Sequence, residues 1–142
     1  MTRTHATLLS ALLALAVLGG CKKVIGDSCN TSADCSIQGD RQCDISQSGG
    51  YCTVVPCDPG TCPDNGECVT FNAHSARLRR TYCMAGCSQD SDCRSDYHCV
   101  HPDSIACVAT LAGTEVLGTG QSCNVFADTS PQKPGWCVQG AR

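Results

Sequence analysis

Fifteen cysteines in 142 residues constrain this chain more than any other feature. Such a density is typical of exported proteins that disulfides stabilise, and it is rare in the reducing cytosol. The chain has only three Tyr, two Phe and one Trp, too little apolar area to offset a backbone ordering cost of about 1–2 kcal/mol per residue. We therefore predict a small disulfide-rich fold, mostly irregular with short β-hairpins, and little or no helix in the mature chain.

The first 20 residues have the pattern of an export signal. Arg3 supplies a positive charge ahead of the apolar run 6–18. That run is shorter than the roughly 20 residues that a helix needs to span a bilayer. We expect residues 1–20 to be removed from the mature chain.

The end of this segment, Leu18-Gly19-Gly20-Cys21, resembles the lipobox of bacterial lipoprotein signals. The resemblance implies that Cys21 carries a thioether-linked diacylglycerol and that cleavage before Cys21 exposes an amine, which is usually acylated too. At about 0.8 kcal/mol per buried methylene, two chains suffice for stable anchoring. The resemblance predicts a lipid-anchored cell-envelope protein. Lys22, directly after the lipidated cysteine, favours location in the outer membrane. Residues 21–28 are the expected tether between the lipid and the folded body. The alternative is an ordinary secretory signal, with Cys21 in a disulfide.

Lipidation of Cys21 leaves an even number of cysteines, as an exported protein with paired disulfides requires. No two of the cysteines stand in the C-x-x-C spacing of structural zinc sites and thioredoxin-like motifs, so we expect no metal or other cofactor. The fourteen disulfide candidates are Cys29, Cys35, Cys43, Cys52, Cys57, Cys62, Cys68, Cys83, Cys87, Cys93, Cys99, Cys107, Cys123 and Cys137.

These cysteines divide into repeated groups. The stretch 29–35 aligns with 87–93, because both are C-x5-C with Asp before the second cysteine, at Asp34 and Asp92. The simplest partition has three four-cysteine modules and a final segment with one disulfide, between Cys123 and Cys137. The predicted units are 29–52, 53–86, 87–110 and 111–142. Short strands are expected at 50–55, 67–71, 106–111 and 135–139.

The repeated C-x4-D-C, together with Cys62-Pro-Asp-Asn-Gly-Glu-Cys68, resembles the EGF-like and Dickkopf-type cysteine-rich segments of bacterial lipoproteins. Four cysteines allow three pairings. The resemblance implies first-to-third and second-to-fourth bonds in each module. Val54-Val55-Pro56 stands where calcium-binding modules have acidic residues, so calcium binding is not carried over. The implied bonds are Cys29 to Cys43, Cys35 to Cys52, Cys57 to Cys68, Cys62 to Cys83, Cys87 to Cys99 and Cys93 to Cys107.

The most distinctive candidate for an interaction is the basic stretch Arg77-Leu78-Arg79-Arg80. It stands out because the mature chain has a net charge of −4, that is 9 basic minus 13 acidic residues once Arg3 is removed. The stretch can contact an acidic partner, lipid head groups or only solvent. With so few basic residues overall, nucleic acid is excluded as a partner.

Other polar clusters do not fit a known reaction. Asp90, Asp92 and Asp96 lack the spacing and the glycine of an EF-hand loop, and solvation of the surface is the preferred interpretation. His98 and His101 flank Cys99, which we expect to be oxidised and therefore not a metal ligand. Nucleophile and phosphate-binding motifs are missing from the sequence, so we predict that the protein is not an enzyme.

Two function classes remain open. The first is a membrane-anchored binding or structural module in the cell envelope, which contacts the membrane through its lipid and an unidentified protein through its body. The second is a membrane-tethered protease inhibitor that offers Arg79 or Arg80 of the 77–80 loop at the cleavage position.

Overall fold

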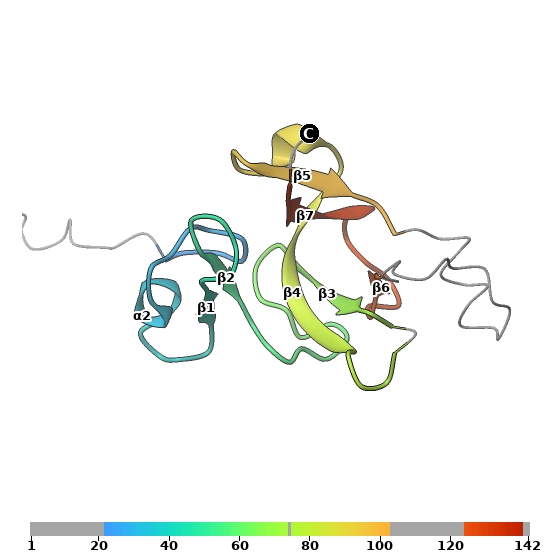
Figure 1. Cartoon of the computed structure of the whole chain (residues 1–142), viewed down its shortest axis with the longest axis horizontal. Helices are drawn as coiled ribbons and strands as arrows, with labels where there is room; N and C mark the ends of the chain where they lie inside the picture. The colour runs from blue at the N-terminus through green and yellow to red at the C-terminus, as the bar shows by residue number, and fades with distance from the viewer. Residues whose placement is uncertain (1–21, 74, 103–123, 141–142) are drawn as a thin grey trace, which may run out of the picture.

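A computed structural model describes residues 22–73, 75–102 and 124–140. Strands β1 and β2 form an antiparallel pair, and the other five form a sheet in the order β5-β7-β4-β3-β6 (Figure 1). The predicted disulfide-rich fold with short strands and almost no helix is confirmed. The elements are α2 (Ser32–Cys35), β1 (Gln42–Asp44), β2 (Tyr51–Thr53), β3 (Gly66–Phe71), β4 (Arg80–Cys87), the 3-10 turn η2 (Asp90–Asp92), β5 (Tyr97–Val100), β6 (Val125–Phe126) and β7 (Gly135–Gln139).

The disulfide-bonded cysteines of the described residues form three sets of four, in which Cys137 takes the fourth place of the third module. In each set the third and fourth cysteines lie directly opposite each other on antiparallel strands. These register pairs are Cys43 with Cys52, Cys68 with Cys83 and Cys99 with Cys137. Neither member of a pair bonds the other, and each bridges instead to an earlier cysteine of its module. The described residues contain six disulfides, which are Cys29–Cys43, Cys35–Cys52, Cys57–Cys68, Cys62–Cys83, Cys87–Cys99 and Cys93–Cys137.

Five of the implied disulfides are therefore confirmed, and the sixth is wrong. Cys93 bonds Cys137, 44 residues along the chain, and not Cys107. The physical reason is that β5 pairs with β7, which places Cys137 opposite Cys99. The pairing of Cys123 with Cys137 is excluded with it. Cys21, Cys107, Cys123 and the predicted strand 106–111 lie outside the described residues.

The repeated aspartates have the same local role in both copies. Asp34 Oδ2 accepts hydrogen bonds from the N–H groups of Asn30 and Thr31, at 2.8 and 2.9 Å. Asp92 Oδ2 accepts one from Ser88 N–H at 2.8 Å. These backbone donors, Asn30 first for Asp34 and Ser88 first for Asp92, hold the pKa of each carboxyl below its usual range. The motif is therefore a turn in which the carboxylate fixes the backbone before the second cysteine.

Arg94 joins the first module to the third. Its guanidinium lies 4.1 Å from the ring centroid of Tyr97 and donates hydrogen bonds to the carbonyls of Ser48 and Gly50, at 2.7 and 2.5 Å. Tyr51 stacks on Tyr97 with 5.5 Å between the ring centroids. A cation on an aromatic face and charge-assisted hydrogen bonds act together here, so the β1–β2 turn is held against the five-stranded sheet.

The N-terminal segment is folded where the sequence predicted a tether. Ile25 is 1% exposed and belongs to the main core. Gly26 N–H donates to the Cys52 carbonyl at 2.9 Å, and buried Arg41 donates to the Lys23 carbonyl and pairs with Asp64 at 3.0 Å. An aliphatic side chain gains roughly 1.5–3 kcal/mol on full burial, which explains why this short stretch docks.

Strand β4 passes through the predicted boundary between the second and third modules. The gap of three residues between Cys83 and Cys87 is too short for a linker, and both cysteines lie on this one strand. β4 pairs with β3 along its length and with β7 at its end. Within the described residues, no helix has the length and apolar character needed to cross a membrane.

Candidate functional site

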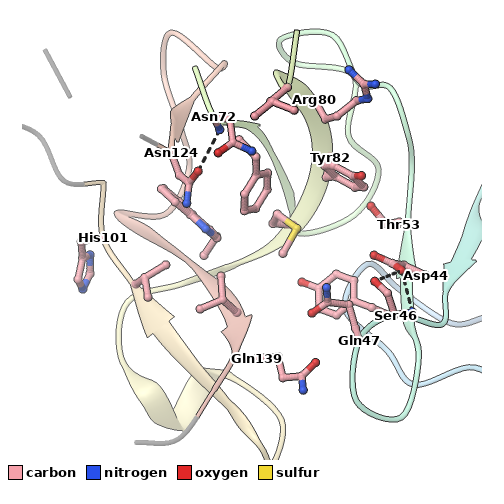
Figure 2. A pocket seen from close by; sticks show the side chains of 17 residues that line it. Asp44, Ser46, Gln47, Thr53, Asn72, Arg80, Tyr82, His101, Asn124 and Gln139 are labelled. Atoms are coloured by element: carbon pink, nitrogen blue, oxygen red, sulfur yellow. Dashed lines mark hydrogen bonds between the residues drawn. The ribbon is translucent and has the colours of Figure 1, made fainter. Parts of the chain in front are cut away.

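A groove of about 560 Å³ lies between the β1–β2 turn and one face of the five-stranded sheet (Figure 2). Its volume falls within the roughly 300–1,000 Å³ of typical ligand sites. Strands and turns from all three modules contribute to it. It is lined by Asp44, Ser46, Gln47, Tyr51, Thr53, Phe71, Asn72, Leu78, Arg80, Tyr82, Met84, Val100, His101, Asn124, Trp136, Val138 and Gln139.

The floor of the groove follows from strand alternation. Successive side chains of a strand point to opposite faces, so Arg80, Tyr82 and Met84 of β4 lie on the groove side while Cys83 bridges to Cys62 on the other. Tyr82 packs edge-on against Phe71 of β3, with 5.6 Å between the ring centroids. The result is an apolar and aromatic surface next to an arginine.

Trp136 of β7 also lines the groove and is 1% exposed. Its ring packs edge-on against Phe126, with 4.9 Å between the centroids. The indole N–H is a donor only, and Trp136 Nε1 is buried with no hydrogen-bond partner among the described residues. Because Nε1 has almost no accessible surface, a ligand in the groove can contact the exposed part of the indole ring but does not reach this N–H.

Side-chain amides and one arginine form the rim. In Figure 2 Arg80 and Asn72 lie at the upper end of the groove, and Gln47 and Gln139 at the lower end. Asn124 Oδ1 accepts from Asn72 N–H at 3.2 Å, and Gln139 Oε1 accepts from Ser48 N–H at 2.7 Å. Because the oxygens of these two amides are engaged, their NH₂ groups are left to donate.

The basic stretch predicted from the sequence forms the loop between β3 and β4. The N–H groups of Leu78 and Arg79 donate to the Ser75 carbonyl at 3.1 and 2.8 Å, so the loop contains a tight turn. Leu78 is 64% exposed, and Leu78 and Arg80 reach the groove. Arg77 and Arg79 are exposed beside it, and the ion pairs among the described residues involve only Arg41.

The aspartates 90, 92 and 96 do not converge on a common point. Asp90 Oδ1 accepts from Cys99 N–H at 2.9 Å, in the way that Ser32 Oγ accepts from Cys43 N–H at 3.1 Å in the first module. Asp92 supports its own turn, and Asp96 has a positive φ of 68°. The carboxylates of Asp90 and Asp92 therefore each fix a backbone N–H group.

His98 and His101 contact neighbouring backbone and side chains and do not form a common site. His101 Nδ1 lies 3.0 Å from the Pro134 carbonyl at the groove rim, and His98 Nδ1 is buried without a partner in the described part of the chain. Across residues 22–73, 75–102 and 124–140, each cluster with metal-ligand spacing consists of disulfide-bonded cysteines. An oxidised sulfur does not bind a metal as a thiolate does. The cysteines of these clusters lie close together because neighbouring disulfides pack against each other.

A second pocket of about 260 Å³ is lined by Glu67 and Asp128, two carboxyl residues that sequence analysis did not select. Glu67 is 4% exposed, and its Oε1 accepts from the N–H groups of Gln132 and Lys133 at 2.8 and 2.9 Å. Asp128 accepts from Gly60 and Cys68 N–H at 2.5 and 2.6 Å. Burial, with Asp128 nearby, raises the pKa of Glu67 above its ordinary 4.5.

The raised pKa of Glu67 gives a testable pH dependence. The folded state holds this proton more tightly than the unfolded state, so the associated stability is full below pH 4.5 and is lost as the pH rises through the folded-state pKa. The substitution Glu67→Gln keeps the acceptor oxygen and removes the charge. We expect the melting temperature of Glu67→Gln to fall less than that of the unmodified protein between pH 4.5 and pH 8. Equal declines in both proteins would contradict this assignment.

Comparison with protein-family models, curated proteins and solved structures gave no match to the chain. The groove is therefore interpreted from its own residues alone. An apolar floor and a rim of amides and guanidinium can hold a ligand that is partly apolar and rich in hydrogen-bond acceptors.

Proposed function

We propose that this protein is a lipid-anchored binding module of the cell envelope that acts by binding and not by catalysis. Cys21 carries the acyl chains, and the groove over β4 and β7 receives a partner. The observation that carries the proposal is the groove itself, because it combines an apolar floor that includes Tyr82 and Met84 with a polar rim. Ligand sites have this composition, whereas scattered exposed apolar side chains do not form such a surface.

The short distance from Cys21 to the body supports a close approach to the membrane. Ile25 is in the core, so only four residue steps at about 3.5 Å, about 14 Å in all, separate it from the lipidated cysteine. The chain enters the body at the left of Figure 1, whereas the β3–β4 loop lies at the lower right. This arrangement favours a groove that remains open to a partner. Lys22 leads us to propose the outer membrane as the location.

The inhibitor alternative has weaker support. An inhibitor loop that a protease binds as it binds a substrate pairs its extended backbone with the enzyme, as an added strand does. The N–H groups of Leu78 and Arg79 are instead used within the loop by the Ser75 carbonyl. The same loop is more useful as one wall of the groove.

Site-specific photo-crosslinking tests the proposal in intact cells. The groove position Leu78 and the control position Ile37, which is 96% exposed, are each replaced by p-benzoylphenylalanine in the full-length precursor. Adducts are expected from position 78 and not from position 37, because only the former lines the groove. The variant Cys21→Ser is expected to leave the membrane fraction.

Two results would contradict the proposal separately. Equal adduct yields at positions 78 and 37, or none at either, would remove the groove as a binding surface. Retention of Cys21→Ser in the membrane fraction would remove the lipid anchor.

A further inference from the structure

We infer that the groove binds an extended peptide segment of another protein, with large apolar side chains on the floor and an acidic side chain at the Arg80 end. This inference rests on the proposed binding function and names the ligand class. It follows from three properties of the groove, namely its apolar floor, its positive charge at one end and its unused hydrogen-bond donors.

The floor requires apolar groups in the ligand. Tyr82 and Met84 of β4, Val138 of β7 and Phe71 of β3 contribute adjacent apolar surface on one face of the sheet. Covering such surface gains roughly 25 cal/mol per Å² of apolar area. The unbranched thioether of Met84 adapts to side chains of different shape, so the floor is suited to Leu, Val or Phe without strict selection among them.

The charge at the loop end requires an anionic group. Arg77, Arg79 and Arg80 lie within four residues of a chain whose net charge is −3. Arg80 Nη1 donates to the Arg79 carbonyl at 2.8 Å, which leaves most of its guanidinium N–H groups free to donate. A guanidinium matches a carboxylate in a bidentate pair, so an Asp or Glu side chain of the ligand fits here.

The unused hydrogen bonds favour a peptide over a fatty acid. Asn124 and Gln139 line the groove, and their side-chain amides have the oxygens engaged and the NH₂ groups left to donate. These donors are distributed along the groove. A peptide offers a carbonyl at every residue, whereas a fatty acid offers acceptors only at one end. Amines and other cations offer no acceptor to these donors.

Binding can be measured with Trp136, the only tryptophan of the chain. The complete lipidated chain in liposomes is titrated with the probe Ac-Asp-Leu-Val-Leu-Gly-NH₂, which contains no fluorophore. We expect a saturable change in Trp136 fluorescence. The charge-reversed probe Ac-Lys-Leu-Val-Leu-Gly-NH₂ should bind at least about tenfold more weakly, because a hydrogen-bonded charge pair is lost.

Two variants of the same loop separate a local contact from a general charge effect. Arg80→Glu should reverse the preference between the two probes, because Arg80 lines the groove. Arg77→Glu changes the charge of the chain equally but lies outside the groove lining, so it should leave the preference within about twofold.

The outcomes that overturn the inference differ from those that overturn the proposed function. Equal affinity for both probes, tighter binding of decanoate than of either peptide, or no response to any probe would each exclude an acidic-apolar peptide. If position 78 still forms crosslinks in cells, the binding function would survive that result. Probe binding that requires replacement of residues 104–123 by a Gly-Ser linker would assign the groove to this chain's own segment, and would also overturn the inference.

Discussion

The double substitution Cys93→Ala with Cys137→Ala should lower the free energy of unfolding by about 4 kcal/mol. This disulfide closes a separation of 44 residues, and the loss of loop-closure entropy in the unfolded chain grows with loop length. The bond also fixes β7 beside β5, so its removal should loosen the edge of the sheet. Equilibrium unfolding in guanidinium chloride measures the change.

A matched control is the pair Cys57→Ala with Cys68→Ala, which opens a separation of only 11 residues. The same treatment gives about 3 kcal/mol for that bond. Proteolytic mapping of the native disulfides should recover Cys93 linked to Cys137. Recovery of Cys93 linked to Cys107 would instead restore the sequence-based pairing and refute the β5–β7 register.

The substitution Trp136→Ala should lower the free energy of unfolding by about 3–5 kcal/mol, the usual range for removing a large aromatic side chain from a core. Trp136 is 1% exposed and packs on Phe126, so the cavity would open between β7 and β6. Because the substitution removes the only tryptophan, unfolding is followed by circular dichroism.

Val138→Ala is the control on the same strand. Val138 is half-buried, so losing its two methyl groups should cost about 1 kcal/mol. A loss below about 1 kcal/mol for Trp136→Ala would mean that the indole is not part of the core, and would also weaken its assignment to the groove.

Much of the disulfide pattern could be predicted because the pairing that the resemblance to EGF-like segments implies joins cysteines close together in the sequence. In the first two modules all four cysteines lie within short separations, and the pairings implied there are confirmed. The recurrence of Asp34 and Asp92 was visible in the sequence. Their role as acceptors of turn N–H groups explains why the motif repeats.

The remaining features depend on contacts between distant segments. Cys107 is nearer to Cys93 than Cys137 is, and counting along the chain cannot reveal that β5 pairs with β7. Strand β4 was not predicted, because Arg80–Cys87 contains two cysteines, an alanine and a glycine and shows no clear alternation. The docking of Ile25 was missed because a single isoleucine between polar residues carries no periodic signal.

The groove could not be predicted from the sequence for the same reason. Its walls come from the β1–β2 turn, from β4 and from β7, which are separated by long stretches of chain. Of the groove residues, sequence analysis singled out only the basic stretch 77–80 and His101 as candidates. The significance of the basic stretch changes once Arg80 is seen beside Tyr82 and Met84, because an isolated charged loop becomes one end of an apolar surface.

The opposed third and fourth cysteines of each module have a consequence for how this scaffold can vary. The segments between the opposed cysteines are 44–51, 69–82 and 100–136, and their lengths range from eight to 37 residues. In each set two disulfides hold the opposed cysteines at the base of the segment. Because lengthening a loop adds little entropic cost once its ends are fixed, these hairpins are natural points of insertion. A foreign epitope grafted between Asp44 and Tyr51 would extend from a base that two disulfides already hold, which makes the protein a template for display.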